Sequence, residues 1–162
     1  MKAAIDLSPG SASCEALSVF MARVERIATP GIVASWGSCE DGTAELQDIW
    51  SERTRREGLA SRYMREALVI ADELGVTIRL HAHPCLYDIA QARSDGESEV
   101  ELKAMKRLNK QTLLNAALIA WYQRLGFVPL PREDDTNDEE TPSMVRRPGT
   151  PMTVRRKSRA PR

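Results

Sequence analysis

The run of residues 44–84 constrains the fold most strongly, because its periodicity changes twice. An extended segment, "AELQDIW" at 44–50, is followed by a glycine-containing turn and then by apolar residues at helical spacing. The apolar positions of that helix are Ala60, Met64, Ala67, Leu68, Ala71 and Leu74. Gly75 stands where a left-handed helix C-cap belongs, and "VTIRLHAH" at 76–83 then alternates apolar and polar residues. The sequence therefore predicts a βαβ unit with Gly58 in its first crossover.

Further elements are expected on both sides of this unit. Ser13 is a candidate N-cap for a helix whose apolar positions continue to Ala28. The segments 32–36 and 44–50 are joined by a loop that contains Asp41-Gly42, which is typical of a β-hairpin. The remaining expected elements are strands at 3–7, 127–130 and around 143–148, and helices at 100–108 and 113–125.

Length and composition indicate one ordinary globular domain. The chain has 162 residues, of which 42% are hydrophobic and 28% charged, and a formal net charge of zero, which points to no polyanionic partner. Three cysteines (Cys14, Cys39 and Cys85) have no CxxC spacing, which argues against a disulfide framework or a zinc site and for a reducing compartment. Since no segment resembles a signal peptide or a membrane span, a cytoplasmic protein without a membrane partner is expected.

The charges are unevenly distributed near the C-terminus. Residues 132–140, "REDDTNDEE", carry six acids and one base, whereas 144–162 carry seven bases and no acid. The acidic segment is a solvated loop, a partner of the chain's own basic tail, or a surface that attracts a cationic substrate. We expect one domain over 1–148 and a basic, disordered tail over 149–162, which would contact nucleic acid weakly and in a salt-dependent way.

Gly58 needs an explanation, since glycine costs about 1 kcal/mol relative to alanine inside a helix. Either the backbone makes a turn there, or a ligand approaches the backbone closely. A strand-to-helix turn presents unpaired N–H groups and the positive end of the helix dipole, which together bind phosphate. The Walker and Rossmann motifs are both absent from this chain.

Two motifs in the predicted order resemble the GNAT superfamily of acetyltransferases. The pattern R-x-x-G-x-A, made by Arg55, Gly58 and Ala60, matches that family's coenzyme signature. An asparagine, a tyrosine seven residues later and a Gly-Phe pair then follow, here Asn115, Tyr122 and Gly126-Phe127. The resemblance covers residues 44–130. It implies an α/β (α+β) fold: a mixed, mostly antiparallel sheet with splayed central strands, flanked by helices.

The resemblance also implies a function, namely N-acetyl transfer from acetyl-CoA to a primary amine of a small molecule or a protein, by direct attack in a ternary complex. Pantetheine would lie between the splayed strands, against backbone groups of Ile49 and Trp50. Asn115 would contact the coenzyme, and Tyr122 would stand near its sulfur and give the departing thiolate a proton or a hydrogen bond. The alternative for Tyr122 is a ring that packs beneath the sheet with its hydroxyl at the surface. The residues expected around the pyrophosphate are Arg55, Arg56, Glu57, Gly58, Leu59, Ala60 and Ser61.

The sequence says less about the residues that would bind the amine acceptor and take its proton. Glu45, Asp48 and His83 are candidates for the general base, and a chain of water molecules is the alternative. His81 and His83 share a strand face, but no third ligand is evident, so no metal is expected. Fewer residues precede the 44–50 strand than in the resembled family, whose first helices form one wall of the acceptor pocket. The long segment 85–112 is expected either to replace that wall or to be a surface excursion without function.

Two other classes of function stay open from the sequence. One is a sensor that binds acetyl-CoA without catalysis, and the other is a nucleic-acid-associated protein that acts through its basic tail. Since members of the resembled family often dimerise, a homodimer also stays open.

Overall fold

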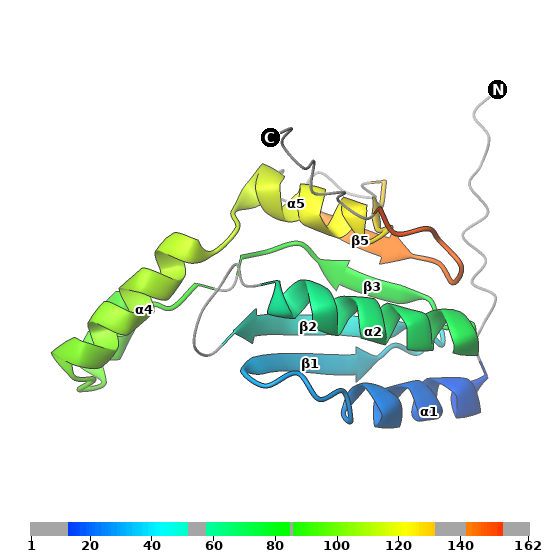
Figure 1. Cartoon of the computed structure of the whole chain (residues 1–162), viewed down its shortest axis with the longest axis horizontal. Coiled ribbons are helices and arrows are strands. Elements are labelled where there is room, and N and C mark those ends of the chain that lie inside the picture. The colour runs from blue at the N-terminus through cyan, green and yellow to red at the C-terminus, as the bar shows by residue number, and fades with distance from the viewer. Residues whose placement is uncertain (1–12, 52–57, 85, 132–141, 154–162) are drawn as a thin grey trace, which may run out of the picture.

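The described part of the chain forms five helices and five strands in a mixed α+β arrangement (Figure 1). The computed structural model describes residues 13–51, 58–84, 86–131 and 142–153. The helices are α1 (Cys14–Val24), α2 (Leu59–Leu74), α3 (Ile89–Ser94), α4 (Glu99–Gln111) and α5 (Asn115–Arg124). The strands are β1 (Ile32–Ser38), β2 (Ala44–Ser51), β3 (Ile78–His81), β4 (Val128–Pro129) and β5 (Ser143–Arg146).

All five strands belong to one sheet in the order β1-β2-β3-β5-β4. Only β2 and β3 are parallel, and the other neighbouring strands are antiparallel. The parallel pair is joined through α2, which confirms the predicted βαβ unit. The predicted mixed, mostly antiparallel sheet is confirmed as well.

Local turn chemistry explains why the first two strands pair. Gly42 has a φ of 80°, and the amide of Cys39 donates to the carbonyl of Thr43 across the loop. The Asp41 carboxylate accepts hydrogen bonds from the amide and the hydroxyl of Thr43, at 3.1 and 2.6 Å. These contacts fix the loop, so the predicted β1–β2 hairpin is confirmed.

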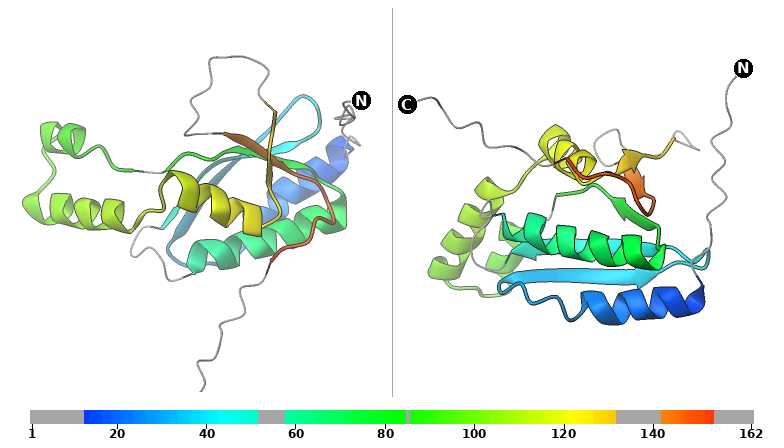
Figure 2. Two further views of the ribbon diagram at one scale, coloured as in Figure 1. Left: turned by 90° about the horizontal axis from the view of Figure 1, so that it is seen from above. Right: turned by 45° about the vertical axis from the view of Figure 1, so that its right-hand side comes forward.

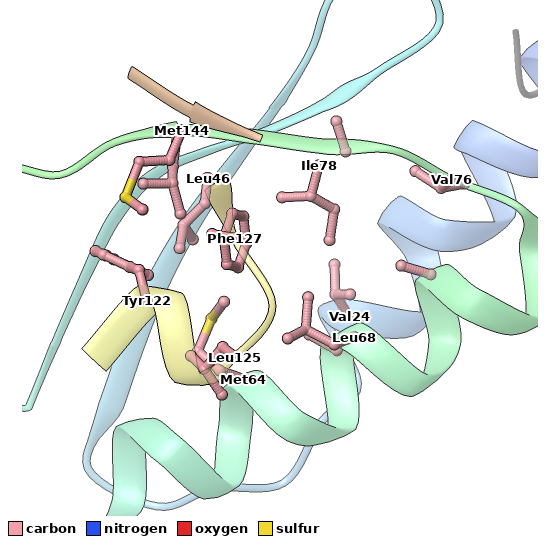
Figure 3. Packing of buried hydrophobic residues seen from close by; sticks show 14 of the residues in the cluster. Val24, Leu46, Met64, Leu68, Val76, Ile78, Tyr122, Leu125, Phe127 and Met144 are labelled. Atoms are coloured by element: carbon pink, nitrogen blue, oxygen red, sulfur yellow. The ribbon is translucent and has the colours of Figure 1, made fainter. Parts of the chain in front are cut away.

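One face of the sheet carries the hydrophobic core (Figure 3). Leu46 of β2, Ile78 and Leu80 of β3 and Met144 of β5 are almost fully buried. They belong to one cluster with side chains from α1, α2 and α5, so these three helices pack on the same face. The helix contribution comprises Leu17, Phe20, Val24, Tyr63, Met64, Ala67, Leu68, Ile70, Ala71, Leu118, Tyr122 and Leu125.

Several elements are shorter than the sequence predicts, among them α1 and β3. Helix α1 begins after its N-cap Ser13, as expected, but ends at Val24. The amides of Arg26 and Ile27 bond to carbonyls three residues earlier, so the chain leaves the α-helix while Ile27 still packs on the core. Strand β3 covers only 78–81 because its neighbour β5 has only four residues. The strand expected at 3–7 lies outside the described residues.

Helices α3 and α4 form an arm at the end of the sheet toward which β2 and β3 run (Figures 1 and 2). Leu102 and Leu108 of α4 are buried, yet they lie outside the main core cluster. At the base of the arm, the Asn109 side chain accepts from the amide of Tyr87 at 2.8 Å and donates to its carbonyl at 2.9 Å. The arm therefore has its own small core, and these two hydrogen bonds hold its two ends together.

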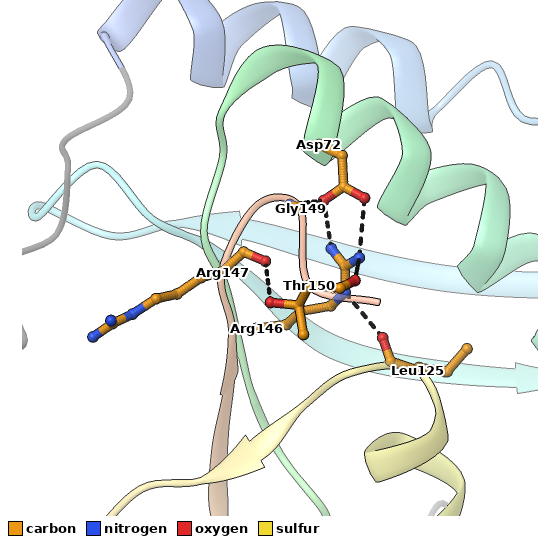
Figure 4. Close-up of polar contacts among 6 residues, drawn as sticks. All are labelled: Asp72, Leu125, Arg146, Arg147, Gly149 and Thr150. Carbon is orange, nitrogen blue, oxygen red and sulfur yellow. Dashed lines mark hydrogen bonds and ion pairs between the residues drawn. The ribbon is translucent and has the colours of Figure 1, made fainter. Parts of the chain in front are cut away.

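The chain continues to pack on the body after β5 (Figure 4). The Arg146 side chain is 1% exposed and makes a two-pronged ion pair with Asp72 of α2, at 2.7 and 3.0 Å. The same guanidinium donates to the carbonyl oxygens of Leu125 and Thr150, at 2.9 and 2.6 Å. Residues from 149 to Thr153, which the sequence assigns to the tail, thus lie against the body, and the amide of Thr153 donates to the carbonyl of Arg124.

No helix in the described part of the chain is long and apolar enough to cross a membrane.

Candidate functional site

The site is built where β2 separates from β3. The two strands pair over only three positions, and the last of these joins Leu46 to Leu80. Beyond Leu46, β2 continues to Ser51 while pairing only with β1 among the described residues. Among the described residues, the edge of β2 that faces β3 is therefore not paired with β3 beyond Leu46.

A β-bulge marks the start of this separation. Ser35 pairs with Asp48 whereas the next residue, Trp36, pairs with Leu46, so Gln47 is an extra residue on β2. The Ser35 hydroxyl lies 3.1 Å from the Gln47 side-chain oxygen across the bulge. Since a bulge bends its strand and increases the local twist, it accounts for the departure of β2 from β3.

The bulge also decides which side chains share a face. After it, pairing with β1 is regular, so Asp48 and Trp50 lie on one face of β2 and Ile49 lies on the other. Ile49 packs against the core cluster, on the side of the helices. Trp50, half-buried, belongs to the opposite face, so only its backbone is suited to the role that the resemblance implies.

The N-terminus of α2 opens toward the same end of the sheet (Figure 1). Gly58 caps this helix with a φ of 75°, and apart from its chain neighbours no described atom lies within 4 Å of the place where its Cβ would be. The first intrahelical bond runs from the amide of Arg62 to the carbonyl of Gly58. In the described structure the preceding amides, those of Leu59, Ala60 and Ser61, have no acceptor, as expected for a helix N-terminus.

The backbone conformation at position 58 by itself explains why this residue is glycine. A φ of 75° is unfavourable for residues that carry a Cβ, so the turn requires glycine whether or not a ligand binds. Apart from the chain neighbours of Gly58, no atom of the described residues occupies the space beside its Cα. Arg55, Arg56 and Glu57, which belong to the same predicted anion site, lie outside the described residues.

A hydrogen bond that the sequence did not reveal connects α2 to α5. The indole N–H of Trp121 donates to the Ser61 hydroxyl oxygen at 2.8 Å. Since the indole can only donate, Ser61 accepts, and its own proton stays available for another acceptor. The two residues are separated by 60 positions, and only the packed fold brings them together.

Tyr122 lies in the core beneath the sheet (Figure 3). It is 4% exposed, and its ring packs against Phe127 at a centroid distance of 5.7 Å and against Trp121 at 4.7 Å. Asn115 is the first residue of the same helix, seven positions earlier. The structure therefore places Tyr122 on the helix side of the sheet, the side opposite to Asp48.

Two of the three candidate bases meet across the separated strands. Nε2 of His83 lies 3.7 Å from Oδ1 of Asp48, and both side chains are 44% exposed. Leu46 and Leu80 form the last pair between β2 and β3. Asp48 lies two positions after Leu46, and His83 lies three positions after Leu80. The pair therefore spans the opening between the strands.

Glu45 lies elsewhere. It precedes the bulge and pairs in register with Arg79 on β3 and Gly37 on β1. Arg79 forms an ion pair with Asp41 at 2.9 Å, so this part of the face belongs to the hairpin end of the sheet. The pKa of Asp41 is lowered, first by the hydrogen bond from the Thr43 side chain.

The two histidines have different partners. Nδ1 of His81 lies 3.0 Å from the Ser143 hydroxyl, whereas His83 faces Asp48. No group of three or more histidine, cysteine, aspartate or glutamate residues that could hold a metal ion occurs within the described ranges.

Comparisons with protein-family models, curated proteins and solved structures found no match for this chain.

Proposed function

We propose that the chain is an N-acetyltransferase of the GNAT type, which transfers the acetyl group of acetyl-CoA to a primary amine. The observation that carries the proposal is the separation of β2 from β3 beside the open N-terminus of α2. A strand edge that has left its parallel neighbour suits the amide-rich pantetheine arm, and the helix N-terminus suits the diphosphate. Both lie at the same end of the sheet.

In this proposal the coenzyme is held mainly by backbone groups. The edge of β2 at Ile49 and Trp50 bonds pantetheine, and the amides of Leu59, Ala60 and Ser61 bond the diphosphate. The Ser61 hydroxyl, which accepts from Trp121, donates its proton to the same phosphate oxygens. Asn115, at the start of α5, contacts the coenzyme.

The reaction is a direct displacement at the acetyl carbon. The amine nitrogen attacks the carbonyl carbon, a C–N bond forms and the C–S bond breaks. The thiolate leaves with the bonding electron pair, and Tyr122 donates a proton or a hydrogen bond to it. An acceptor that arrives as an ammonium ion loses two protons in all, of which one ends on sulfur and the other in solvent.

Calorimetry with acetyl-CoA tests the binding part, and α2 provides a matched control. Gly58 and Gly75 cap its two ends with φ values of 75° and 68°, and apart from chain neighbours a Cβ would meet no described atom within 4 Å at either position. Gly58→Val and Gly75→Val should therefore destabilise the fold by similar amounts, about 1–2 kcal/mol. Only Gly58→Val should weaken acetyl-CoA binding, by about tenfold or more, because its side chain stands beside the phosphate site.

Thiol release in the presence of acetyl-CoA and a panel of amines tests the catalytic part. The panel contains n-butylamine, spermidine, lysine ethyl ester and trialanine. Release that depends on an amine supports the transferase, whereas binding without release indicates a sensor. Absence of heat with acetyl-CoA, together with equal behaviour of the two glycine variants, contradicts the proposal as a whole.

A further inference from the structure

We infer that His83 is the group that takes the proton from the attacking amine, and that Asp48 positions its imidazole. This inference rests on the proposed function, and it assigns the proton acceptor that the fold alone leaves undetermined. The observation that carries it is the pairing of Nε2 of His83 with Oδ1 of Asp48 across the opening between β2 and β3.

The location of His83 and Asp48 suits the removal of a proton from the acceptor amine. The acetyl group of a coenzyme held between the separated strands would lie in that opening, just beyond Leu46 and Leu80. The helices fill one face of the sheet, and Asp48 belongs to the other face. An acceptor amine that approaches from this other face therefore meets His83 and Asp48 before it reaches the acetyl carbon.

The orientation of the imidazole also fits. Nε2 is directed to a carboxylate, which favours the tautomer with the hydrogen on Nε2 and a lone pair on Nδ1. In the described part of the chain, Nδ1 of His83 has no hydrogen-bond partner. The distance of 3.7 Å is longer than a hydrogen bond, as is common for catalytic pairs before substrate binds, and exposure of both side chains leaves room for it to shorten.

The acceptor nitrogen loses two protons during the reaction. An alkylammonium acceptor gives one proton to Nδ1 of His83 and so becomes a nucleophilic amine. As the C–N bond forms, the nitrogen loses its second proton, which ends on the departing sulfur. The imidazolium, stabilised by the Asp48 carboxylate, then releases its proton to solvent.

His81 provides the matched control. It is the chain's only other histidine, it stands two residues earlier, it is exposed, and it faces Ser143 instead of the opening. The experiment measures acetyl-CoA turnover with the best primary amine of the panel, for the wild type, His83→Gln, His81→Gln and Asp48→Asn. Circular dichroism and acetyl-CoA calorimetry on each variant establish that the fold and the coenzyme site are intact.

His83→Gln should lower kcat by about 10²- to 10⁴-fold, as removal of a general base does, without changing acetyl-CoA affinity. His81→Gln should leave kcat unchanged. Asp48→Asn should lower kcat less than His83→Gln does, and Asp48→Glu should recover part of the loss.

Two further readouts separate proton transfer from a structural role. Added imidazole should restore turnover to His83→Gly, because it can occupy the vacated space and accept the proton. Hydroxylamine, which is a free base at neutral pH, should react with His83→Gln at a rate much closer to that of the wild type.

Wild-type turnover in His83→Gln, or no imidazole rescue of His83→Gly, overturns the inference while leaving the transferase intact. If the wild-type protein binds no acetyl-CoA, the proposed function fails and this inference fails with it.

Discussion

At the scale of single residues, the most demanding feature is the buried guanidinium of Arg146. A charge removed from water in this way is tolerated only when it is paired and its donors are satisfied. Asp72 and the carbonyl oxygens of Leu125 and Thr150 meet this requirement. The same carboxylate also accepts from the amide of Gly149 at 2.8 Å, so it joins α2 to the segment after β5 (Figure 4).

Asp72→Asn should therefore lower the free energy of unfolding by about 3 kcal/mol, because Arg146 stays buried without its counter-charge. The adjacent Glu73 is the control, since it pairs with Arg23 at 2.9 Å but both side chains are about half exposed. Glu73→Gln should cost at most about 1 kcal/mol. Urea denaturation of the two variants measures the difference, and equal losses would contradict the role given to the pair.

The effect of Asp72 should depend on pH in a defined direction. Burial alone would raise the pKa of this carboxyl, but the hydrogen bonds from Arg146 and Gly149 and the charge of Arg146 outweigh it and lower the pKa. A group with a lowered folded pKa stabilises the protein above its unfolded pKa of about 3.9 and loses that contribution as pH falls through the folded pKa. The stability gap between wild type and Asp72→Asn should thus be constant near neutral pH and shrink below about pH 4.

Sequence reasoning could not find these residue pairs. Asp72 and Arg146 are 74 positions apart, and Ser61 and Trp121 are 60 apart. Neither pair belongs to a local motif, so each depends on how the helices pack on the sheet. Asp48 and His83 were singled out as separate candidates, but their meeting depends on the bulge at Gln47, which leaves no signal in the sequence.

At the scale of elements, local signals predicted much of what the structure contains. Asp41-Gly42 predicted the hairpin, and Gly75 predicted the left-handed end of α2, with a φ of 68°. Both depend on the conformational preferences of a few adjacent residues. Element ends were less predictable because they depend on neighbours, as the short β3 shows.

The α3–α4 arm is the element whose role is least dictated by the fold. It lies at the end of the sheet where β2 and β3 separate (Figures 1 and 2). If the chain is the proposed transferase, its acceptor pocket would need a further wall at this end. Its base is also suited to excision, since Tyr87 and Asn109 are joined by two hydrogen bonds and so are already adjacent.

Replacing residues 88–108 with two glycines should leave the body folded, because Leu102 and Leu108 lie outside the main core. Acetyl-CoA affinity should stay within about threefold of the wild type, while turnover with the amine acceptor should fall by about tenfold or more, since the acceptor loses a positioning surface. Calorimetry and thiol release measure the two effects. Unchanged turnover would show that the arm is a surface excursion without a role in catalysis.

At the scale of the whole molecule, the segment after β5 belongs to the body. Met152 packs against the core, and the amide of Thr153 donates to Arg124 of α5 at 2.8 Å. A domain boundary at 148, which the change in composition suggests, would cut through these contacts. The backbone after Pro148 is thus part of what holds α2 and α5 together.

Compared with a chain that ends at Thr153, a chain that ends at Pro148 should be less stable by about 2 kcal/mol or more, because it loses several hydrogen bonds and exposes donors of Arg146. Thermal unfolding of the two truncated proteins tests this expectation. Equal melting temperatures would place the end of the folded body at 148.

The position of β5 between β3 and β4 also determines the order in which the protein can be assembled. A ribosome delivers β1, β2, α2 and β3 early, and these elements can pair as they emerge. Among the described residues β4 bonds to β5 alone, and it is made before β5. The nascent chain must therefore keep β4 and one side of β3 unpaired until translation has passed Arg146, and a chaperone that shields exposed strand edges would have its greatest effect during that interval.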